Sequence, residues 1–346
     1  MKRYKIAVIF GGNSTEYPVS LQSASAILEN LDQEKYEIIP IGITRQGDWY
    51  RYYGTFDGIA ADAWQEDGAI TPVVVSQNPS VGGIIELGEN GNKITKLDFA
   101  FPVLHGKNGE DGTVQGVFEL AGIPVIGCNT LSSALCMDKD RAHKLVELAG
   151  IAAPKAVVLN ETNRGEAASL CRELSWPLFV KPVRAGSSFG ITKIYEEAEL
   201  KPAVDLAFQH DTEVIIEENI EGFEVGCAVL GTDQLLVGRV DEIELTDGFF
   251  DYTEKYTLKT SKIHMPARID NTCEKEIQET AKRIYRALGC TGFARVDMFL
   301  TPEGRIVFNE VNTIPGFTSH SRYPNMMKGI GLSFGEILDK LIGLYL

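Results

Sequence analysis

The sequence contains few of the residues that build disulfide scaffolds or zinc sites. No CxxC pair occurs, and the five histidines do not cluster beside cysteines. This spacing argues against a disulfide framework or a zinc site and predicts reduced, buried thiols, as in a cytoplasmic protein. The six scattered cysteines are Cys128, Cys136, Cys171, Cys227, Cys273 and Cys290.

Long apolar runs are also missing. No stretch approaches the roughly 20 apolar residues of a membrane-spanning helix. The apolar run at residues 5–10, KIAVIF, is too short for a signal peptide, which needs roughly 7–15 apolar residues and a small-residue cleavage site. We therefore expect a cytoplasmic protein without a membrane partner.

Positive charge is scarce. The chain carries 33 Lys and Arg against 48 Asp and Glu, a net charge of −15. Nucleic acids and anionic membranes require basic patches, so neither is expected as a partner. The net negative charge does not exclude an anionic small-molecule substrate, because a local cluster of Lys and Arg with a divalent metal can outweigh the negative charge of the whole protein.

The familiar nucleotide-binding glycine motifs are absent. There is no GxxxxGK[ST] loop, and KIAVIFGGNS at residues 5–14 lacks the third glycine of GxGxxG. No ribose-binding acid ends the second strand either, which argues against a dinucleotide-dependent oxidoreductase. A non-catalytic nucleotide-sensing module is a further alternative. The many cationic and metal-ligating residues described below argue against it, because a module that only binds a nucleotide does not need them.

At 346 residues the chain is long enough for two or three domains. Apolar strands at 5–10, 37–44 and 97–106, closed by 123–127, alternate with helices and predict a doubly wound parallel sheet within residues 1–130. The weakly periodic stretch 54–92 is interpreted as an excursion from that sheet.

Two further domains are expected. Residues 131–217 alternate short strands and helices and predict a compact α+β unit, whose first helix begins near Asp138 or Lys139 and ends at Gly150. Residues 218–346 are β-rich and contain a long helix at 273–289 and a terminal helix. The fold class is therefore α/β followed by α+β.

Three oxygen-bearing side chains lie in the segment ARVDMFLTPEGRIVFNEVNTIPGF, residues 294–317. The spacing of Glu310 and Asn312 places both on one strand face, and a turn at PEG brings Asp297 beside them. Magnesium prefers such oxygen ligands and borrows others from phosphate and water. A polar sheet face is the alternative, but Arg295 adds a cation where oxyanion charge would collect.

A second group of residues suits a nucleotide. Gly186, Ser187, Ser188 and Gly190 form a small-residue loop between two β-type runs, and Lys181 lies just upstream. Converging backbone N–H groups beside a cation favour phosphate binding over a simple turn. Glu217 and Glu224 are equally compatible with a solvated acidic edge and with contacts to a nucleoside.

Several motifs together resemble the D-alanine–D-alanine ligase family. GGNSTE (11–16), LHGKNGEDGTVQG (104–116), MDKDRAHK (137–144), VKPVRAGSSFGITK (180–193), DYTEKY (251–256) and RVDMF…FNEVNTIPGFTSHS follow the family's order along the whole chain. The resemblance implies an ATP-grasp fold with ATP held between the last two domains. It also implies a ligase that activates a first D-alanine as an acyl phosphate, with lids at 185–190 and 246–262.

The resemblance assigns roles residue by residue. ATP phosphates would contact Lys139, Lys181 and Ser188, with Glu217 at the adenine and Glu224 at the ribose. Two magnesium ions, for which manganese can substitute, would be held by Asp297, Glu310 and Asn312. The first substrate's ammonium would be held by Glu16 with His105 nearby, and Ser187 and Tyr256 would link to Glu16. Lys255 would reach the transferred phosphate, Arg295 and the Gly316 N–H would form the oxyanion site, and Ser321 would receive the second substrate's carboxylate.

One position departs from the housekeeping pattern. Arg322 follows TSHS where an aliphatic residue is usual, and Phe250 stands where tyrosine is common; both resemble the D-alanine–D-serine ligases of vancomycin-type resistance. The retained Glu254-Lys255-Tyr256 favours an amine nucleophile over D-lactate. The sequence thus predicts a D-Ala–D-Ser ligase acting in peptidoglycan-precursor synthesis, with a D-Ala–D-Ala ligase as the alternative, and the family resemblance predicts a homodimer.

Overall fold

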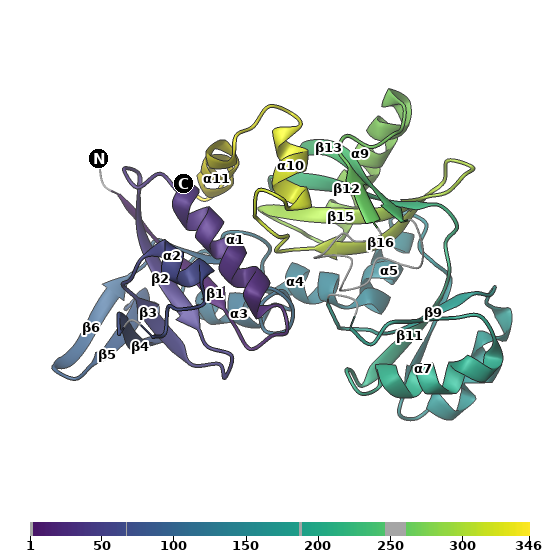
Figure 1. The fold of residues 1–346 in the computed structure, drawn as a ribbon, viewed down its shortest axis with the longest axis horizontal. Coiled ribbons are helices and arrows are strands. Elements are labelled where there is room, and N and C mark those ends of the chain that lie inside the picture. Colours follow the sequence, from purple (N-terminus) through teal and green to yellow (C-terminus); the bar gives the residue numbers. More distant parts are fainter. Residues whose placement is uncertain (1–2, 67, 187–188, 246–260) are drawn as a thin grey trace.

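Three β-sheets organise the chain in the computed structural model, which describes residues 3–66, 68–186, 189–245 and 261–346 (Figure 1). A mixed seven-stranded sheet forms the N-terminal part, a four-stranded antiparallel sheet the middle, and a five-stranded antiparallel sheet the C-terminal part. Figure 1 shows the three sheets side by side, with helix α4 between the first sheet and the other two.

The first strand of the N-terminal sheet contains a continuous buried run. In β1 every residue from Ile6 to Gly11 is buried, as expected for a strand covered on both faces. The sheet order is β6-β5-β4-β3-β2-β1-β7. Its elements are β1 (Tyr4–Gly11), α1 (Tyr17–Asn30), β2 (Tyr36–Ile43), β3 (Trp49–Tyr52), α2 (Phe56–Ala60), β4 (Ile70–Val75), β5 (Gly83–Gly88), β6 (Gly91–Lys96), β7 (Phe99–Pro102) and α3 (Thr113–Leu120).

The predicted parallel sheet is only partly right. Strands β2, β1 and β7 are parallel, whereas β3 to β6 continue the same sheet antiparallel. The interpretation of residues 54–92 as an excursion is therefore wrong. Their apolar periodicity is weak because the strands within the stretch are short and mix apolar with polar or exposed residues: β4 buries Val73 and Val75, and β5 buries Gly83, Ile84 and the charged Glu86. The stretch 123–127 contributes a single parallel bridge, from Val125 to Ala100.

Two consecutive helices connect the first sheet to the second. Asp138 ends α4 (Thr130–Met137) and caps α5 (Lys139–Leu148), because its side chain accepts the N–H of Arg141. Gly150 follows α5 with φ +73°, a conformation that favours glycine, which confirms the predicted helix end. The middle sheet, in the order β10-β9-β11-β8, contains β8 (Ala156–Asn160), α6 (Ala167–Leu170), β9 (Leu178–Pro182), β10 (Thr192–Ile194), α7 (Leu200–Ala207) and β11 (Glu213–Glu218).

The C-terminal sheet is covered on one face by a long amphipathic helix. Asp270 caps α9 (Asn271–Ala287), whose buried residues Ile277, Ala281 and Ile284 recur at helical spacing and pack on the sheet. The strands, in the order β14-β13-β12-β15-β16, are β12 (Phe223–Leu230), β13 (Leu236–Leu245), β14 (Ser261–His264), β15 (Phe293–Leu300) and β16 (Ile306–Asn312).

Two helices end the described chain. The short α10 (Arg322–Lys328), which the sequence did not predict, contacts β12 and β13. Helix α11 (Phe334–Gly343) begins with a capping box of Ser333 and Glu336 and packs against α1 of the first sheet. Its buried Leu338 and Leu341 share one hydrophobic core with residues of β1 and α1.

All six cysteines are free thiols, and five of them are buried as predicted, while Cys273 is half-buried. None of the helices in the described parts of the chain is long and apolar enough to cross a membrane.

Candidate active site

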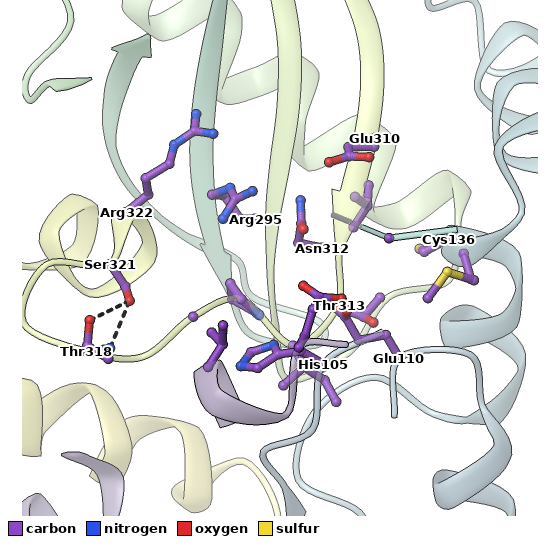
Figure 2. A pocket seen from close by; sticks show the side chains of 18 of the residues that line it. His105, Glu110, Cys136, Arg295, Glu310, Asn312, Thr313, Thr318, Ser321 and Arg322 are labelled. Atoms are coloured by element: carbon purple, nitrogen blue, oxygen red, sulfur yellow. Dashed lines mark hydrogen bonds between the residues drawn. The ribbon is translucent and has the colours of Figure 1, made fainter. Parts of the chain in front are cut away.

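Two cavities meet at the edge of the C-terminal sheet. The first, about 530 Å³, lies between the N-terminal part and β15, β16 and α10, and the second, about 550 Å³, lies between the middle and C-terminal sheets. Lys139 and Glu310 line both cavities, so a cation and a carboxylate stand where the two spaces join. Figure 2 shows the first cavity.

The structure brings the predicted metal-ligand residues together. Asp297 on β15 faces Glu310 on β16 in cross-strand register, and Arg295 faces Asn312 in the same way. The Asn312 amide donates to Asp297 Oδ2 at 2.9 Å. The register shifts after Asp297, where Asn309 is the extra residue on β16, an irregularity of the kind that re-aims side chains beside active sites.

These residues fit a magnesium ion that receives further ligands from phosphate. Among the described residues, no three His, Cys, Asp or Glu side chains converge on one point. Magnesium typically takes one or two protein carboxylates together with phosphate oxygens and water. Asp297 and Glu310, in register and beside the junction of the cavities, match that requirement.

Arg295 and Asp297 form a buried pair. Arg295 donates from Nε to Asp297 Oδ1 at 2.8 Å and from Nη2 to Oδ2 at 2.6 Å. Burial alone would lower the pKa of Arg295, but the charges of Asp297 and Asp241 outweigh it, so the pKa is raised and the guanidinium stays charged. A permanent cation therefore faces the first cavity.

Arg322 is the centre of a second buried ion-pair network. It donates from Nε and Nη2 to Asp241, at 2.7 and 2.8 Å, and from Nη1 to Glu224 at 2.8 Å. Gly226 leaves room for it, because a Cβ there would lie 2.4 Å from Nη2. Arg322 lines the first cavity and Glu224 the second, so one side-chain pair connects the two.

The wall of the first cavity on the N-terminal side carries Glu16 and His105. Both are buried, and a Cβ on Gly106 or Gly186 would lie 2.7 or 3.1 Å from Glu16 Oε2, so two loops approach this carboxylate closely. Burial lowers the pKa of His105, although the Glu16 charge opposes it, so the imidazole is neutral at pH 7.

The opposite wall carries the loop after β16. Ser321 Oγ accepts the N–H of Thr318 at 2.9 Å and lies 2.9 Å from the Thr318 hydroxyl (Figure 2). Gly316 lies beside it, since a Cβ there would be 3.0 Å from Ser321 Oγ. The predicted oxyanion and carboxylate-binding residues thus share one loop.

The second cavity contains a buried ion pair. Lys181 Nζ lies 2.6 Å from Glu217 Oε2, and both side chains are less than one-tenth exposed. The other oxygen, Glu217 Oε1, lies 3.8 Å from His143 Nδ1; both atoms are buried without a hydrogen-bond partner among the described residues. Buried polar atoms are normally paired, so these two mark a place for a polar ligand.

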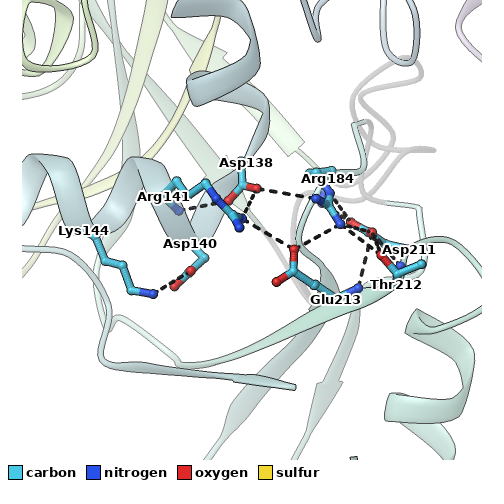
Figure 3. Close-up of polar contacts among 8 residues, drawn as sticks. All are labelled: Asp138, Asp140, Arg141, Lys144, Arg184, Asp211, Thr212 and Glu213. Carbon is cyan, nitrogen blue, oxygen red and sulfur yellow. Dashed lines mark hydrogen bonds and ion pairs between the residues drawn. The ribbon is translucent and has the colours of Figure 1, made fainter. Parts of the chain in front are cut away.

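Lys139 is positioned by a charged cluster at the start of α5. The Lys139 side chain donates from Nζ to the carbonyl oxygen of Ala185 at 2.8 Å, and the Lys139 backbone N–H donates to the carbonyl oxygen of Val183 at 3.2 Å. The intervening Arg184 pairs with Asp211 at 2.7 Å and Glu213 at 3.1 Å (Figure 3). Arg141 joins the helix cap Asp138 to Glu213. The cluster fixes the segment 183–185 against α5.

Several predicted residues lie outside the described parts of the chain: Ser187, Ser188, Phe250, Lys255 and Tyr256. Two residues of the site, Glu110 and His143, were given no role in the sequence analysis. They fall inside the quoted motifs LHGKNGEDGTVQG and MDKDRAHK, which was the available signal. Asp241 is, with Phe250, an alternative determinant of the preference for D-serine, but its pairing with Arg322 gives no local signal, because the two are far apart in sequence.

The comparisons with known proteins agree with this geometry. The models of the D-ala D-ala ligase N-terminus and C-terminus match residues 5–128 and 145–343. The chain belongs to the D-ala D-ala ligase family. It is therefore an ATP-dependent ligase that forms a peptide bond, and its fold is the predicted ATP-grasp fold.

Individual relatives include resistance and housekeeping members of the family. The solved structure of the VanG D-Ala:D-Ser ligase from Enterococcus faecalis is 69% identical, covers 100% of both chains and has a TM-score of 0.94. The vancomycin/teicoplanin A-type resistance protein VanA of Enterococcus faecium is 45% identical, covering 100% of this chain and 99% of its own. A D-alanine–D-alanine ligase of Caldicellulosiruptor bescii is 43% identical, covering 99% and 95%.

Proposed function

We propose that the protein is an ATP-dependent D-alanine–D-serine ligase, which makes a D-Ala-D-Ser dipeptide for peptidoglycan precursors and confers vancomycin resistance. The observation that carries the proposal is Arg322, a buried cation on the wall of the cavity where the second amino acid would sit. The 69% identity to a solved D-Ala:D-Ser ligase over the whole chain supports it.

Arg322 suits recognition of a hydroxyl. A guanidinium has five N–H donors, and three of them are used by the hydrogen bonds to Asp241 and Glu224. Nη1 also lies 3.5 Å from Asp297 Oδ1, so the second N–H of Nη2, on the same rigid fork, is the donor left for a serine hydroxyl. A site built to donate to a hydroxyl discriminates against a methyl group, because a buried donor would be left unpaired.

The other residues fit the reaction in the order it requires. Glu16 would hold the first D-alanine through its ammonium, beside neutral His105. Lys139, at the junction of the cavities, would contact the phosphoryl group as it passes from ATP to the carboxylate. Arg295 and the Gly316 N–H would stabilise the oxyanion formed when the amine of D-serine attacks the acyl phosphate.

The second cavity would hold ATP. Lys181 and Ser188 would contact phosphates, Glu224 the ribose and Glu217 the adenine, whose amino group could pair with the buried Glu217 Oε1. Asp297, Glu310 and Asn312 would hold magnesium, which neutralises phosphate charge when bound. Two ions, substitution by manganese, a homodimer and a cytoplasmic location are parts of the same proposal.

A competition assay tests the proposal. Purified protein, magnesium, ATP and D-alanine are offered D-serine, D-alanine and D-lactate together, and the products are weighed by mass spectrometry. We expect D-Ala-D-Ser to dominate, with phosphate release requiring both ATP and D-alanine. Comparable kcat/KM for D-serine and D-alanine would instead support the second candidate function, a D-Ala–D-Ala ligase. The 43% identity to a D-alanine–D-alanine ligase favours that candidate.

A further inference from the structure

The ion pair between Arg322 and Glu224 belongs to both cavities. Arg322 begins α10 and lines the first cavity, and its Nη1 donates to Glu224 Oε1 at 2.8 Å. Glu224 lies near the start of β12 and lines the second cavity. The two side chains are only 7% and 15% exposed, so solvent and salt screen the contact little. The pair is therefore a direct contact between the two binding spaces.

The Arg322 end of the pair has little freedom to move. Nε and Nη2 donate to the buried Asp241 of β13 at 2.7 and 2.8 Å. A Cβ on Gly226 would lie 2.4 Å from Nη2, so the backbone of β12 passes close beside the guanidinium. Because the guanidinium is planar and rigid, a shift of Nη1 also turns Nη2, which carries the N–H left for a serine hydroxyl.

The Glu224 end faces the space proposed for ATP. Its register partners Ile243 on β13 and Phe299 on β15 line the same cavity, so this face of the sheet forms one wall of it. A carboxylate has about four acceptor positions, so Glu224 can accept ribose hydroxyl groups while it holds Arg322. The orientation of the guanidinium then depends on whether a nucleotide is bound.

We propose that Glu224 is a positioning residue that couples nucleotide binding to recognition of the second amino acid. The inference rests on the proposed function, which places the ribose beside Glu224 and D-serine beside Arg322. Ribose hydroxyl groups that donate to Glu224 hold Nη1 of Arg322 in place, and this aims the N–H of Nη2 at the serine hydroxyl. The preference for D-serine is therefore complete only when the nucleotide carries its ribose hydroxyl groups.

Nucleotide analogues test the coupling in the wild-type enzyme. The ratio of kcat/KM for D-serine to kcat/KM for D-alanine is measured with saturating ATP and with saturating 2′,3′-dideoxy-ATP. We expect the ratio to fall about tenfold with the dideoxy nucleotide, a typical size for coupling between two sites. Equal ratios with the two nucleotides would overturn the proposal.

Glu224 variants show whether this side chain carries the effect. Glu224→Ala should lower the ratio with ATP about tenfold and make it the same with both nucleotides. Glu224→Gln keeps one oxygen acceptor and should retain part of the dependence on the nucleotide. A Glu224→Ala enzyme that loses activity equally toward D-serine and D-alanine would show a purely structural role and overturn the proposal.

Glu221→Gln is the matched control. Glu221 also lines the second cavity, on the exposed connection between β11 and β12. The change removes the same charge from the same cavity, so the D-serine to D-alanine ratio should stay at the wild-type value with either nucleotide. A Glu221→Gln enzyme whose ratio falls as far as that of Glu224→Ala would show a general effect of charge and overturn the proposal.

Calorimetry separates this inference from the proposed function. Because coupling is reciprocal, Arg322→Met/Asp241→Asn should bind magnesium-ADP about fivefold more weakly than wild type, although Arg322 lines the other cavity. Adding Glu224→Ala to this variant should weaken binding no further than Glu224→Ala does alone. Wild-type affinity in the double variant, or additive losses, would overturn the coupling. A wild-type enzyme that makes mainly D-Ala-D-Ala from the competing mixture would instead overturn the proposed function.

Discussion

The two cavities are similar in size but are held in place by different kinds of interaction. In the first, Ser23 Oγ on α1 accepts the N–H of Phe317, which joins the N-terminal part to the loop after β16. In the second, the central contact is an ion pair, Lys181 with Glu217, between neighbouring strands of one sheet. The difference teaches that the first cavity depends on how the N-terminal and C-terminal parts meet, whereas the second depends on local charge.

The largest expected effect comes from Glu310, one of the residues that line both cavities. Glu310→Gln keeps the shape but removes the charge proposed to bind metal, so kcat should fall about 10²- to 10³-fold while Tm stays unchanged. Glu303→Gln, an exposed change on the turn of the same hairpin, should leave kcat at the wild-type value. A Glu310→Gln enzyme with wild-type kcat would contradict the metal assignment.

The second prediction concerns the bridge between the cavities. Arg322→Met leaves Asp241, which is 0% exposed, as an unpaired buried charge, and removal of one partner from a buried pair costs about 3–5 kcal/mol. Urea denaturation should show this loss, and Arg322→Met/Asp241→Asn should recover most of it.

Both variants should lose the preference for D-serine. An unchanged D-serine to D-alanine ratio of kcat/KM in Arg322→Met would place specificity elsewhere, at Phe250 or Asp241, and an unchanged ratio in the double variant as well would leave Phe250.

The cavities should also respond to pH in opposite directions. Burial lowers the pKa of His143 below 6.5, and Lys181 lowers it further while Glu217 opposes, so the folded state binds fewer protons than the unfolded state. Stability from this group is lost as pH falls below 6.5. Wild-type Tm should therefore fall more than that of His143→Gln between pH 7.5 and 5.

The pH dependence of stability expected from Glu110 has the opposite sign to that expected from His143. Its pKa of about 8 lies above 4.5, so the folded state binds more protons and stability falls as pH rises between these values. Glu110→Gln should lack this slope in a series of Tm measurements. Parallel pH curves for wild type and both variants would show that neither side chain titrates differently on folding.

The smallest effect is expected from the cluster that holds Lys139. Arg184 is 38% exposed, so its pairs with Asp211 and Glu213 are screened by solvent and salt. Arg184→Ala should raise KM for ATP only about threefold, leave KM for D-alanine unchanged and show a smaller change at high salt. Arg172→Ala, on the exposed surface of the same middle part, provides the control.

The elements that the sequence predicted are those whose signals are local. The period-two spacing of Glu310 and Asn312 and the PEG turn placed the predicted metal-ligand residues on adjacent strands, and the register confirms that the strands are adjacent. The cap at Asp138 and the glycine at 150 bounded α5 correctly. Both patterns depend only on backbone geometry within a few residues.

Contacts between distant segments were not predictable in the same way. Nothing near Arg322 in sequence shows that Asp241 will neutralise it, and nothing near Ser23 points to Phe317. The antiparallel strands β4 to β6 were missed because they are short and bury few apolar side chains: β5 buries the charged Glu86 beside Ile84, and β6 buries only Thr95.

The packing of α11 on α1 has a consequence for synthesis of the chain. The first sheet appears first from the ribosome, but Leu338, Leu341 and Ile342 belong to the same hydrophobic core as Phe10 and Leu28. That core stays incomplete until α11 has emerged. Nascent N-terminal segments should accordingly remain protease-sensitive until α11 has been synthesised.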